Sequence, residues 1–400
     1  MIIPDIIKAL ARKYREETIS YRRNLHMYPE LSFKEYETSR FIAEQLERSD
    51  ILFQTGYVKT GIVGKIRAGN PGAGVVALRA DMDALPIREE NQVSYRSKNN
   101  GIMHACGHDL HMASLLGAAK ILKELDGSFD GTVLLVFQPG EELIPGGASL
   151  MIEEGALNNP KPDLIIAQHV SPDLEAGKMG FRNGKYMASS DEIYMTIRGK
   201  GGHAALPDQT TDTVLITSRI IVELKEMITN KPYGGIPTIL SFGRISAEGA
   251  TNVIPGEVTV EGTFRTFDEE WRKEAHLLLS DKAKEIAAES GGICEFHIAP
   301  GYPFLINDEK VTRSARKYTS QYIGEENIVP LDLRMTSEDF AYFSQVFPAT
   351  LFRLGTRNEK KNIISSLHSP TFDIDEDIIE LSSGNLAWLT VSFLSEKQTR

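Results

Sequence analysis

Side chains that can bind a metal ion or carry a proton gather in one short stretch of this sequence and in one pair of adjacent acids. The stretch 104–111 contains three histidines and a cysteine, among them Cys106 and His108. Imidazole, thiol and carboxylate groups together suit a borderline or transition metal rather than calcium, which prefers oxygen ligands. In the pair Glu141 and Glu142, one carboxylate could bind an ion while the other takes the proton of an activated water. These residues predict hydrolysis assisted by metal ions.

Other features of the sequence exclude several classes of protein. It contains no Gly-x-Ser-x-Gly elbow and no phosphate-binding loop, and the stretch 199–203 lacks the spacing of a dinucleotide fingerprint. The 44 Lys and Arg against 55 Asp and Glu give a formal net charge of −11, so we expect no nucleic-acid partner. No apolar run has the length that spans a membrane, and no secretory signal is visible. The only two cysteines, Cys106 and Cys294, exclude a disulfide framework and predict a cytoplasmic protein.

The reactive side chains need a scaffold, and a series of apolar segments predicts one. The segments 75–80, 132–138, 164–168 and 350–354 are typical of strands buried on both faces, and helical patterns such as 112–125 separate them. This alternation predicts an α/β fold with a mostly parallel sheet. Ligands bind outside the carboxyl ends of such strands. The residues expected at that edge are Asp81, Asp83, Glu141, Glu142, His169 and, from a later loop, His368.

A middle segment has a different pattern. Between residues 187 and 299 the expected elements follow the order β-α-β-β-α-β, which is typical of a ferredoxin-like two-layer domain. We therefore expect a catalytic, metal-binding domain formed by residues 1–186 and 300–400. A smaller α+β domain, residues 187–299, is inserted into it.

Eight motifs occur in order between about residues 20 and 390. Taken together they resemble the metal-dependent amidohydrolase family of aminoacylases, hippurate hydrolases and auxin-conjugate hydrolases, which is metallopeptidase-like. A single motif such as SEDF would be weak, but the co-linear set is specific. The motifs are RRNLHMYPE (22–30), LRADMDALP (78–86), MHACGHDLH (103–111), FQPGEE (137–142), GKGGHAALP (199–207), TNVIP (251–255), SEDF (337–340) and LHSP (367–370).

The resemblance implies a role for particular residues. Glu141 would be the general base, and His203 of the inserted domain would stabilise the oxyanion, reaching into the partner's site across a homodimer, or within a tetramer. The inserted domain would thus serve as lid and dimerisation domain. Two divalent ions (zinc, manganese, nickel or cobalt) would be held by the implied ligands Cys106, His108, Glu142, His169 and His368.

The resemblance implies further contacts around this centre. Asn252 and Arg265 would bind the substrate's carbonyl or carboxylate, since a planar guanidinium matches a carboxylate. Asp83 would orient a ligand imidazole. Some relatives place a first ligand at the position of Asp81, and this chain departs from them there. We expect His104 and His111 to support the site by hydrogen bonding or packing rather than by ligation.

The sequence thus predicts an enzyme that hydrolyses the amide bond of small N-acyl amino acids. The alternative within enzymes is a dipeptidase or carboxypeptidase with the same metal centre, or an N-acetyl-diaminopimelate-type deacetylase. Glu141 and Glu142 could instead be first-turn acids that complement a helix dipole. A binder that retains the fold without catalysis is disfavoured because Glu141 and all five ligand positions are filled. A purely structural scaffold is disfavoured because reactive side chains cluster at strand ends.

Overall fold

The computed structural model describes residues 3–230 and 233–398. The chain forms two compact units, each with its own core. The first comprises Met1–Gly184, Ile306–Asp332 and Asp339–Arg400, and the second comprises Lys185–Leu305 and Leu333–Glu338. The second unit therefore includes the short segment 333–338, which lies outside the expected inserted domain of residues 187–299. Short strands β7 (Gly184–Met187) and β14 (Leu305–Asn307) lie where the chain passes from one unit to the other.

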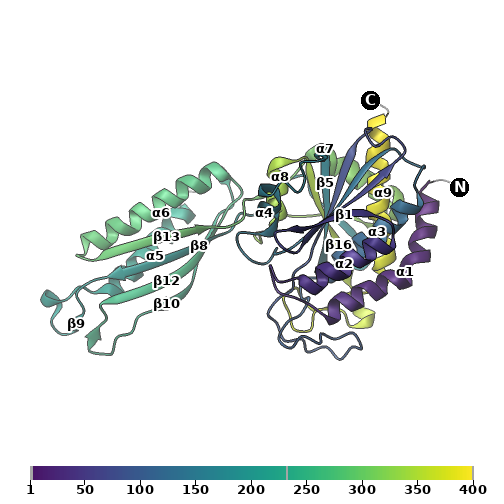
Figure 1. Ribbon diagram of the computed structural model, residues 1–400. Coiled ribbons are helices and arrows are strands. Elements are labelled where there is room, and N and C mark those ends of the chain that lie inside the picture. Colours follow the sequence, from purple (N-terminus) through teal and green to yellow (C-terminus); the bar gives the residue numbers. More distant parts are fainter. Residues whose placement is uncertain (1–2, 231–232, 399–400) are drawn as a thin grey trace. The chain divides into compact units, whose positions relative to one another are not determined.

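An eight-stranded sheet forms the centre of the first unit (Figure 1). Its strand order is β1-β2-β4-β3-β5-β16-β6-β15. The neighbours β4, β3, β5 and β16 run parallel to one another, whereas β1 and β2 form an antiparallel edge. The predicted α/β fold with a mostly parallel sheet is confirmed. The strands are β1 (Leu52–Tyr57), β2 (Gly61–Ala68), β3 (Val75–Asp81), β4 (Gly131–Gln138), β5 (Leu164–Glu175), β6 (Met179–Phe181), β15 (Ile328–Pro330) and β16 (Ala349–Arg357).

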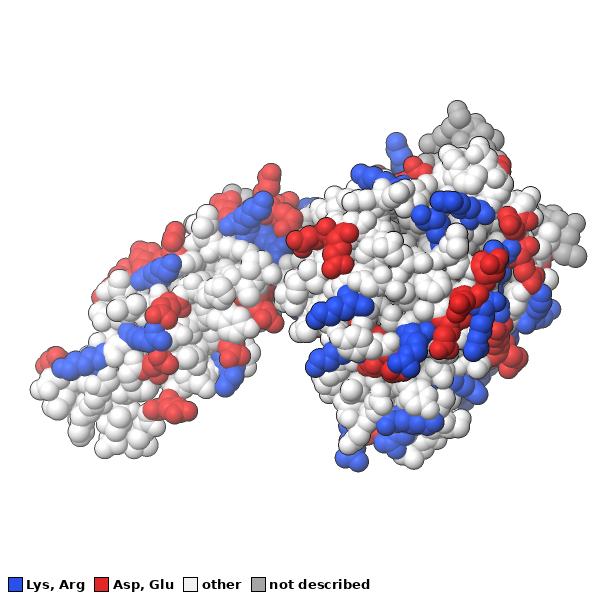
Figure 2. Space-filling model, viewed as in Figure 1, with Lys and Arg blue, Asp and Glu red and all other residues white. Residues whose placement is uncertain are grey.

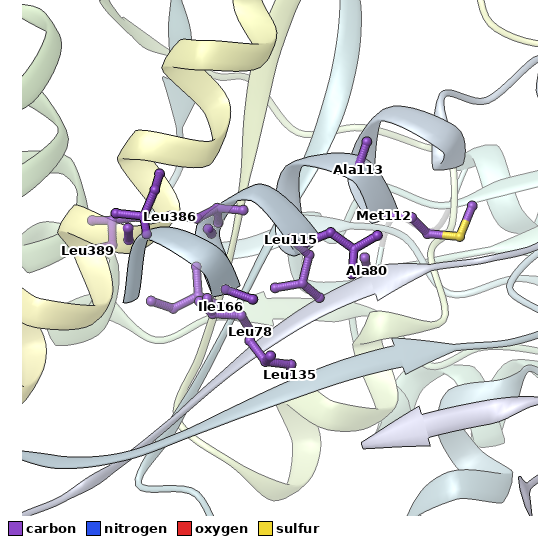
Figure 3. Close-up of a cluster of buried hydrophobic side chains, with 14 of the residues drawn as sticks. Leu78, Ala80, Met112, Ala113, Leu115, Leu135, Ile166, Leu386 and Leu389 are labelled. Carbon is purple, nitrogen blue, oxygen red and sulfur yellow. The ribbon is translucent and has the colours of Figure 1, made fainter. Parts of the chain in front are cut away.

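Helices cover both faces of this sheet, and the alternation of side chains along β3 shows how. Leu78 and Ala80 lie under Leu115 of α3, in a core that α9 completes through Leu386 (Figure 3). Arg79, between them, points to the other face, where its guanidinium lies 5.9 Å from the ring of Phe340 on α8. The helices are α1 (Ile3–Met27), α2 (Tyr36–Arg48), α3 (His108–Glu124), α4 (Gly147–Glu153), α7 (Glu309–Ile323), α8 (Phe340–Val346) and α9 (Ile378–Gln398), with short 3-10 turns at Glu325–Asn327 and Glu359–Lys361.

The second unit contains a four-stranded antiparallel sheet in the order β10-β12-β8-β13. Along the chain, the strands and helices of its core alternate as β-α-β-β-α-β, and the helices share one apolar core with the sheet. The elements are β8 (Asp191–Arg198), β9 (Gly202–His203), α5 (Thr213–Asn230), β10 (Ile239–Ser246), β11 (Val253–Ile254), β12 (Glu257–Arg265), α6 (Glu269–Glu289) and β13 (Ile293–Pro300), with 3-10 turns at Pro207–Gln209 and Tyr233–Gly235.

The surface carries charges of both signs. On the face shown in Figure 2, acidic and basic side chains are interspersed over each unit rather than gathered into one basic area. Within the described ranges, no helix combines the length and the apolar character needed to cross a membrane.

Candidate metal centre

The parallel strands bring the predicted site residues to one level of the sheet. Asp81, the last residue of β3, pairs with Gln138 at the end of β4. On the other side of β3, Arg79 pairs with Ala167, which places Asp81 level with His169 two residues further on. The prediction that a strand ends before His169 is wrong, because β5 continues to Glu175. His169 therefore projects from within a buried strand.

Helix α3 starts earlier than predicted, and its start places two histidines. Gly107 precedes the helix with φ +81°, and a Cβ there would lie 2.6 Å from Val170 Cγ2, so this position requires glycine. The helix begins at His108 rather than at about Met112. His108 and His111, three residues apart, therefore share one helix face, with ring centroids 5.5 Å apart.

All five predicted ligand side chains converge in the first unit. Donor atoms of Cys106, His108 and His169 lie within 4.8 Å of one another, and so do those of Cys106, Glu142 and His368. Cys106 belongs to both sets. Its Sγ lies 3.5 Å from His169 Nε2, and His368 Nε2 lies 3.3 Å from Glu142 Oε1. The arrangement provides two overlapping donor sets that share one sulfur.

Hydrogen bonds to the main chain fix which imidazole nitrogens are free to bind a cation. His108 Nδ1 lies 2.8 Å from the carbonyl oxygen of Asp83, and His169 Nδ1 lies 2.8 Å from that of Val170. A carbonyl can only accept, so each Nδ1 carries a proton, and Nε2 is the nitrogen left to bind a cation. Among the described residues, His108 Nε2 is buried without a hydrogen-bond partner. An orphaned polar atom of this kind is what a bound metal ion would satisfy, so the donor set fits the implied ions.

The electrostatics of the site also favour a cation. Burial lowers the pKa of His108, but Asp81, Asp83 and Glu142 outweigh burial and raise that pKa to about 10. Burial and the charge of Glu142 hold the pKa of the Cys106 thiol well above its usual range. A positive charge is therefore favoured at His108 Nε2 and is needed before Cys106 ionises. A divalent cation meets both requirements.

Asp83 holds the pair of acids in place. Its Oδ1 accepts the backbone N–H of Glu141 at 3.0 Å, and its Oδ2 accepts that of Glu142 at 2.9 Å and the hydroxyl of Ser32 at 2.6 Å. The expected contact with a ligand imidazole is made chiefly by the Asp83 carbonyl, since its carboxylate lies 3.4 Å from His108 Nδ1. Asp83 thus orients both the imidazole and the two acids.

Glu141 and His368 complete this part of the site. Glu141 is 7% exposed, its donor atoms lie within 4.8 Å of those of His108 and Glu142, and its Oε1 accepts the backbone N–H of Asp339 at 3.4 Å. His368 has φ +59°, which is uncommon for a residue other than glycine, and its N–H donates to Ala105 O at 2.9 Å. Such a backbone conformation often accompanies a functional residue.

A buried polar group behind the site was missed by the sequence analysis. Arg79 Nη1 donates to Asp81 at 2.6 Å and Arg79 Nη2 donates to Asp339 at 2.9 Å, while Gln138 donates to Asp339 at 2.7 Å. An arginine at the centre of an apolar strand was the available signal, because arginine is rarely fully buried unless paired.

The three predicted residues of the second unit do not form one cluster. β9 and β11 pair His203 with Val253, so His203 and Asn252 lie close together, and both are exposed. Arg265 lies at the far end of β12, about 26 Å along the strand from Glu257 at a rise of about 3.3 Å per residue. Its Nη1 donates to Met335 O at 3.2 Å and to Ser337 Oγ at 3.3 Å.

Comparison with known proteins places the chain in a family. The model of peptidase family M20/M25/M40 matches residues 77–383. The chain belongs to this family. The resemblance to metal-dependent amidohydrolases is thereby confirmed, and so is the prediction of a metal-dependent hydrolase acting on amides.

Three similar proteins cover most of the chain. Thermostable carboxypeptidase 1 of Saccharolobus solfataricus is 37% identical over 98% of this chain and 99% of its own. The N-acyl-L-amino acid amidohydrolase of Geobacillus stearothermophilus is 41% identical over 75% of this chain and 80% of its own. The crystal structure of Bacillus subtilis YXEP, described as a dinuclear metal-binding peptidase of the M20 family, has a TM-score of 0.83 at 34% identity and covers 96% of this chain and 99% of that one.

Proposed function

We propose that this protein hydrolyses the amide bond of N-acyl amino acids at a centre of two divalent metal ions. The observation that carries the proposal is the pair of donor sets that share Cys106 and lie beside Glu141. The dinuclear description of YXEP and the name of the Geobacillus amidohydrolase support it. The proposed ligands are Cys106, His108, Glu142, His169 and His368. A thiolate ligand favours zinc, nickel or cobalt, while carboxylate and imidazole also accept manganese.

The residues of the first unit would divide the proton transfers between them. Bound divalent ions would lower the pKa of a water molecule and polarise the amide carbonyl. Glu141 takes the proton of the attacking water and delivers it to the leaving amine nitrogen, as a general base and then a general acid. Asp83 holds the main chain of Glu141, so the carboxylate stays in place through both transfers. The shared thiolate of Cys106 suits a reducing compartment such as the cytoplasm.

The second unit would bind the substrate and act across a dimer. We propose that His203 and Asn252 donate hydrogen bonds to the developing oxyanion or the substrate carbonyl, and that Arg265 binds its carboxylate. The full length of β12 separates the first two residues from the third, so we propose that one protomer does not bring all three to its own site. This supports His203 and Asn252 serving the partner's site. Exposed apolar side chains suited to a contact between copies lie on α5 and β10, namely Val214, Leu215, Val222, Ile239 and Ile245.

The alternative is a carboxypeptidase or dipeptidase with the same centre, which the Saccharolobus relative favours. Kinetics of the metal-reconstituted protein on N-acetyl and N-benzoyl amino acids, alongside dipeptides and N-blocked peptides, separate the two. We expect N-acyl amino acids to be preferred. A preference of about 100-fold or more for peptides, roughly 2.7 kcal/mol in the barrier, would select the peptidase instead.

The role of Glu141 is tested on the same substrates. Removal of a general base should lower kcat by about 10²- to 10⁴-fold in Glu141→Gln, with metal content unchanged. Turnover within about tenfold of the wild-type value would contradict the mechanism.

A further inference from the structure

His111 differs from His108 because both of its ring nitrogens take part in hydrogen bonds. The backbone N–H of Val170 donates to His111 Nε2 at 3.0 Å. Because a backbone N–H can only donate, Nε2 must accept, and the ring proton is on Nδ1. Nδ1 then donates to Asp81 Oδ1 at 2.6 Å. The donor atoms of Asp81, His108 and His111 lie within 4.8 Å of one another, yet both His111 nitrogens are already engaged.

The hydrogen bond from Val170 connects His111 to a proposed ligand. Val170 donates its N–H to His111 and accepts the Nδ1 proton of His169 on its carbonyl oxygen at 2.8 Å. The His111 and His169 ring centroids are 4.8 Å apart. His111 therefore holds the residue that sets both the tautomer and the orientation of His169.

Asp81 is itself fixed from behind. Arg79 Nη1 donates to Asp81 Oδ2 at 2.6 Å, so the two oxygens of this carboxylate hold Arg79 and His111. Arg79 Nε donates to Gln138 at 2.8 Å, and all these side chains are fully buried or nearly so. A chain of hydrogen bonds thus runs from the end of β4 through β3 and α3 to β5.

We propose that His111 is a positioning residue for His169 and not a metal ligand. Asp81 keeps the proton on His111 Nδ1, and His111 Nε2 holds the backbone N–H of Val170, the residue whose carbonyl oxygen orients His169 so that its Nε2 faces the ion. The inference rests on the proposed metal centre. It assigns to Asp81, at the position where some relatives carry a ligand, the task of fixing a tautomer.

Three variants test the two hydrogen bonds of His111 separately. His111→Gln can keep an acceptor near Val170, His111→Asn can keep a donor to Asp81, and His111→Phe keeps only the ring. We expect Asn and Phe to weaken the affinity for one cobalt ion by about 10- to 100-fold, and Gln to weaken it less. Two equivalents should still bind at saturation, and the second ion, near His368, should keep its affinity. The expected supporting hydrogen bond of His104 is not found, since this side chain is equally buried but has no hydrogen-bond partner among the described residues. His104→Leu is therefore the matched control and should bind cobalt with wild-type affinity.

A measurement on the wild-type protein avoids the question of folding. With isotope-labelled histidine and an NMR-active cadmium isotope, His108 and His169 should couple to cadmium through Nε2. His111 should show an Nδ1–H tautomer without such coupling. Cadmium coupling to His111, loss of a whole metal equivalent in His111→Asn, or wild-type affinity in all three variants would each overturn the inference. If the wild-type protein binds two ions and hydrolyses N-acyl amino acids in those cases, the proposed function stands without it.

Discussion

At the residue scale, both halves of the proposed metal centre depend on Cys106. Its sulfur belongs to the donor set with His108 and His169 and to the one with Glu142 and His368. We therefore expect Cys106→Ala to lower the affinity for both ions, and His368→Asn to lower the affinity for one. Activity should fall by at least about 10²-fold in each variant, because the ions contribute several kcal/mol to the transition state.

Metal content after dialysis against a dilute zinc buffer measures the difference between these two variants. Cys294→Ser is the control, because this second cysteine lies on β13 of the other unit and should not change the metal content. Loss of a single ion in Cys106→Ala, with the other bound at wild-type affinity, would show that the sulfur is not shared.

We expect Glu35 to make the free energy of unfolding depend on pH. Burial and the charge of Asp83 raise the pKa of Glu35 to about 7, although Thr60 and the backbone N–H of Gly140 hydrogen-bond its carboxylate. The folded state therefore binds this proton more tightly than the unfolded state does. The stabilisation that the bound proton gives the folded state is fully present below about pH 4.5 and is lost as the pH rises to about 7. This loss in the free energy of unfolding is roughly 3 kcal/mol.

The comparison of Glu35→Gln with the wild-type protein isolates this effect. Relative to wild type, the variant should gain free energy of unfolding between pH 5 and pH 8, measured by denaturant titration at both values. Glu37→Gln, exposed in the first turn of α2, the helix that follows Glu35, should show no such difference. An equal effect of Glu35→Gln at both pH values would contradict the prediction.

The residue types of the site could be predicted from the sequence, whereas their hydrogen bonds could not. Four of the five ligand candidates and Glu141 lie in motifs, and the fifth, His169, directly follows an apolar segment, so their side-chain chemistry is visible in the sequence. Which ring nitrogens of His108 and His111 are hydrogen-bonded depends on main-chain groups of Asp83 and Val170, and only the folded chain brings these groups near. Arg79 was missed for the same reason, since its partner Asp339 is 260 residues away.

At the scale of elements, the turn between β4 and α4 carries both acids and depends on a glycine. Gly140 has φ +64°, and a Cβ there would lie 2.3 Å from Phe33 Cε1. We expect Gly140→Ala to lower the free energy of unfolding by about 1–3 kcal/mol, because it adds both backbone strain and an overlap. Gly177→Ala is the matched control: φ is also positive there, at +92°, but no atom lies within 4 Å of the added Cβ.

A double-mutant cycle separates the two costs at Gly140. In the background of Phe33→Ala the overlap is removed and only the backbone cost remains, so the two substitutions together should cost less than their sum. Denaturant unfolding of the four proteins measures this coupling. Simple additivity would mean that the Phe33 ring moves away freely.

Helices and strands could be predicted where their burial produces a run or a regular spacing of apolar residues in the sequence. The apolar strands β3 and β4 were found to within one residue at each end. β1 was missed because most of its residues are exposed, so no alternation marks it. The early start of α3 was missed because its first turn contains His108 and His111, whose residue types serve the site and do not mark a helix.

At the scale of the whole molecule, long-range topology limited what the sequence could predict. The segment Leu333–Glu338 belongs to the second unit, although 32 residues of chain lie between the end of β13 and its start. Within that unit it accepts hydrogen bonds from Arg265, and it leads along the chain directly into Asp339, whose N–H contacts Glu141. No local sequence pattern predicts such a connection, because residues 333–338 form neither a helix nor a strand.

The proposed exchange of His203 between protomers predicts a specific pattern of complementation. His203→Ala alone should lower kcat by about 10²- to 10³-fold, as loss of one oxyanion donor does, and Glu141→Gln alone should be nearly inactive. In a heterodimer of the two variants, the protomer with an intact Glu141 receives His203 from its partner, whereas the other site lacks its base. One competent site of two gives about half of the wild-type activity per dimer in a closed two-fold assembly.

Two differently tagged chains, co-expressed and purified through both tags, provide this heterodimer for assay, and its mass in solution checks the dimer itself. If His203 serves the site of its own protomer, both sites of the heterodimer are defective and activity stays at the level of the single variants.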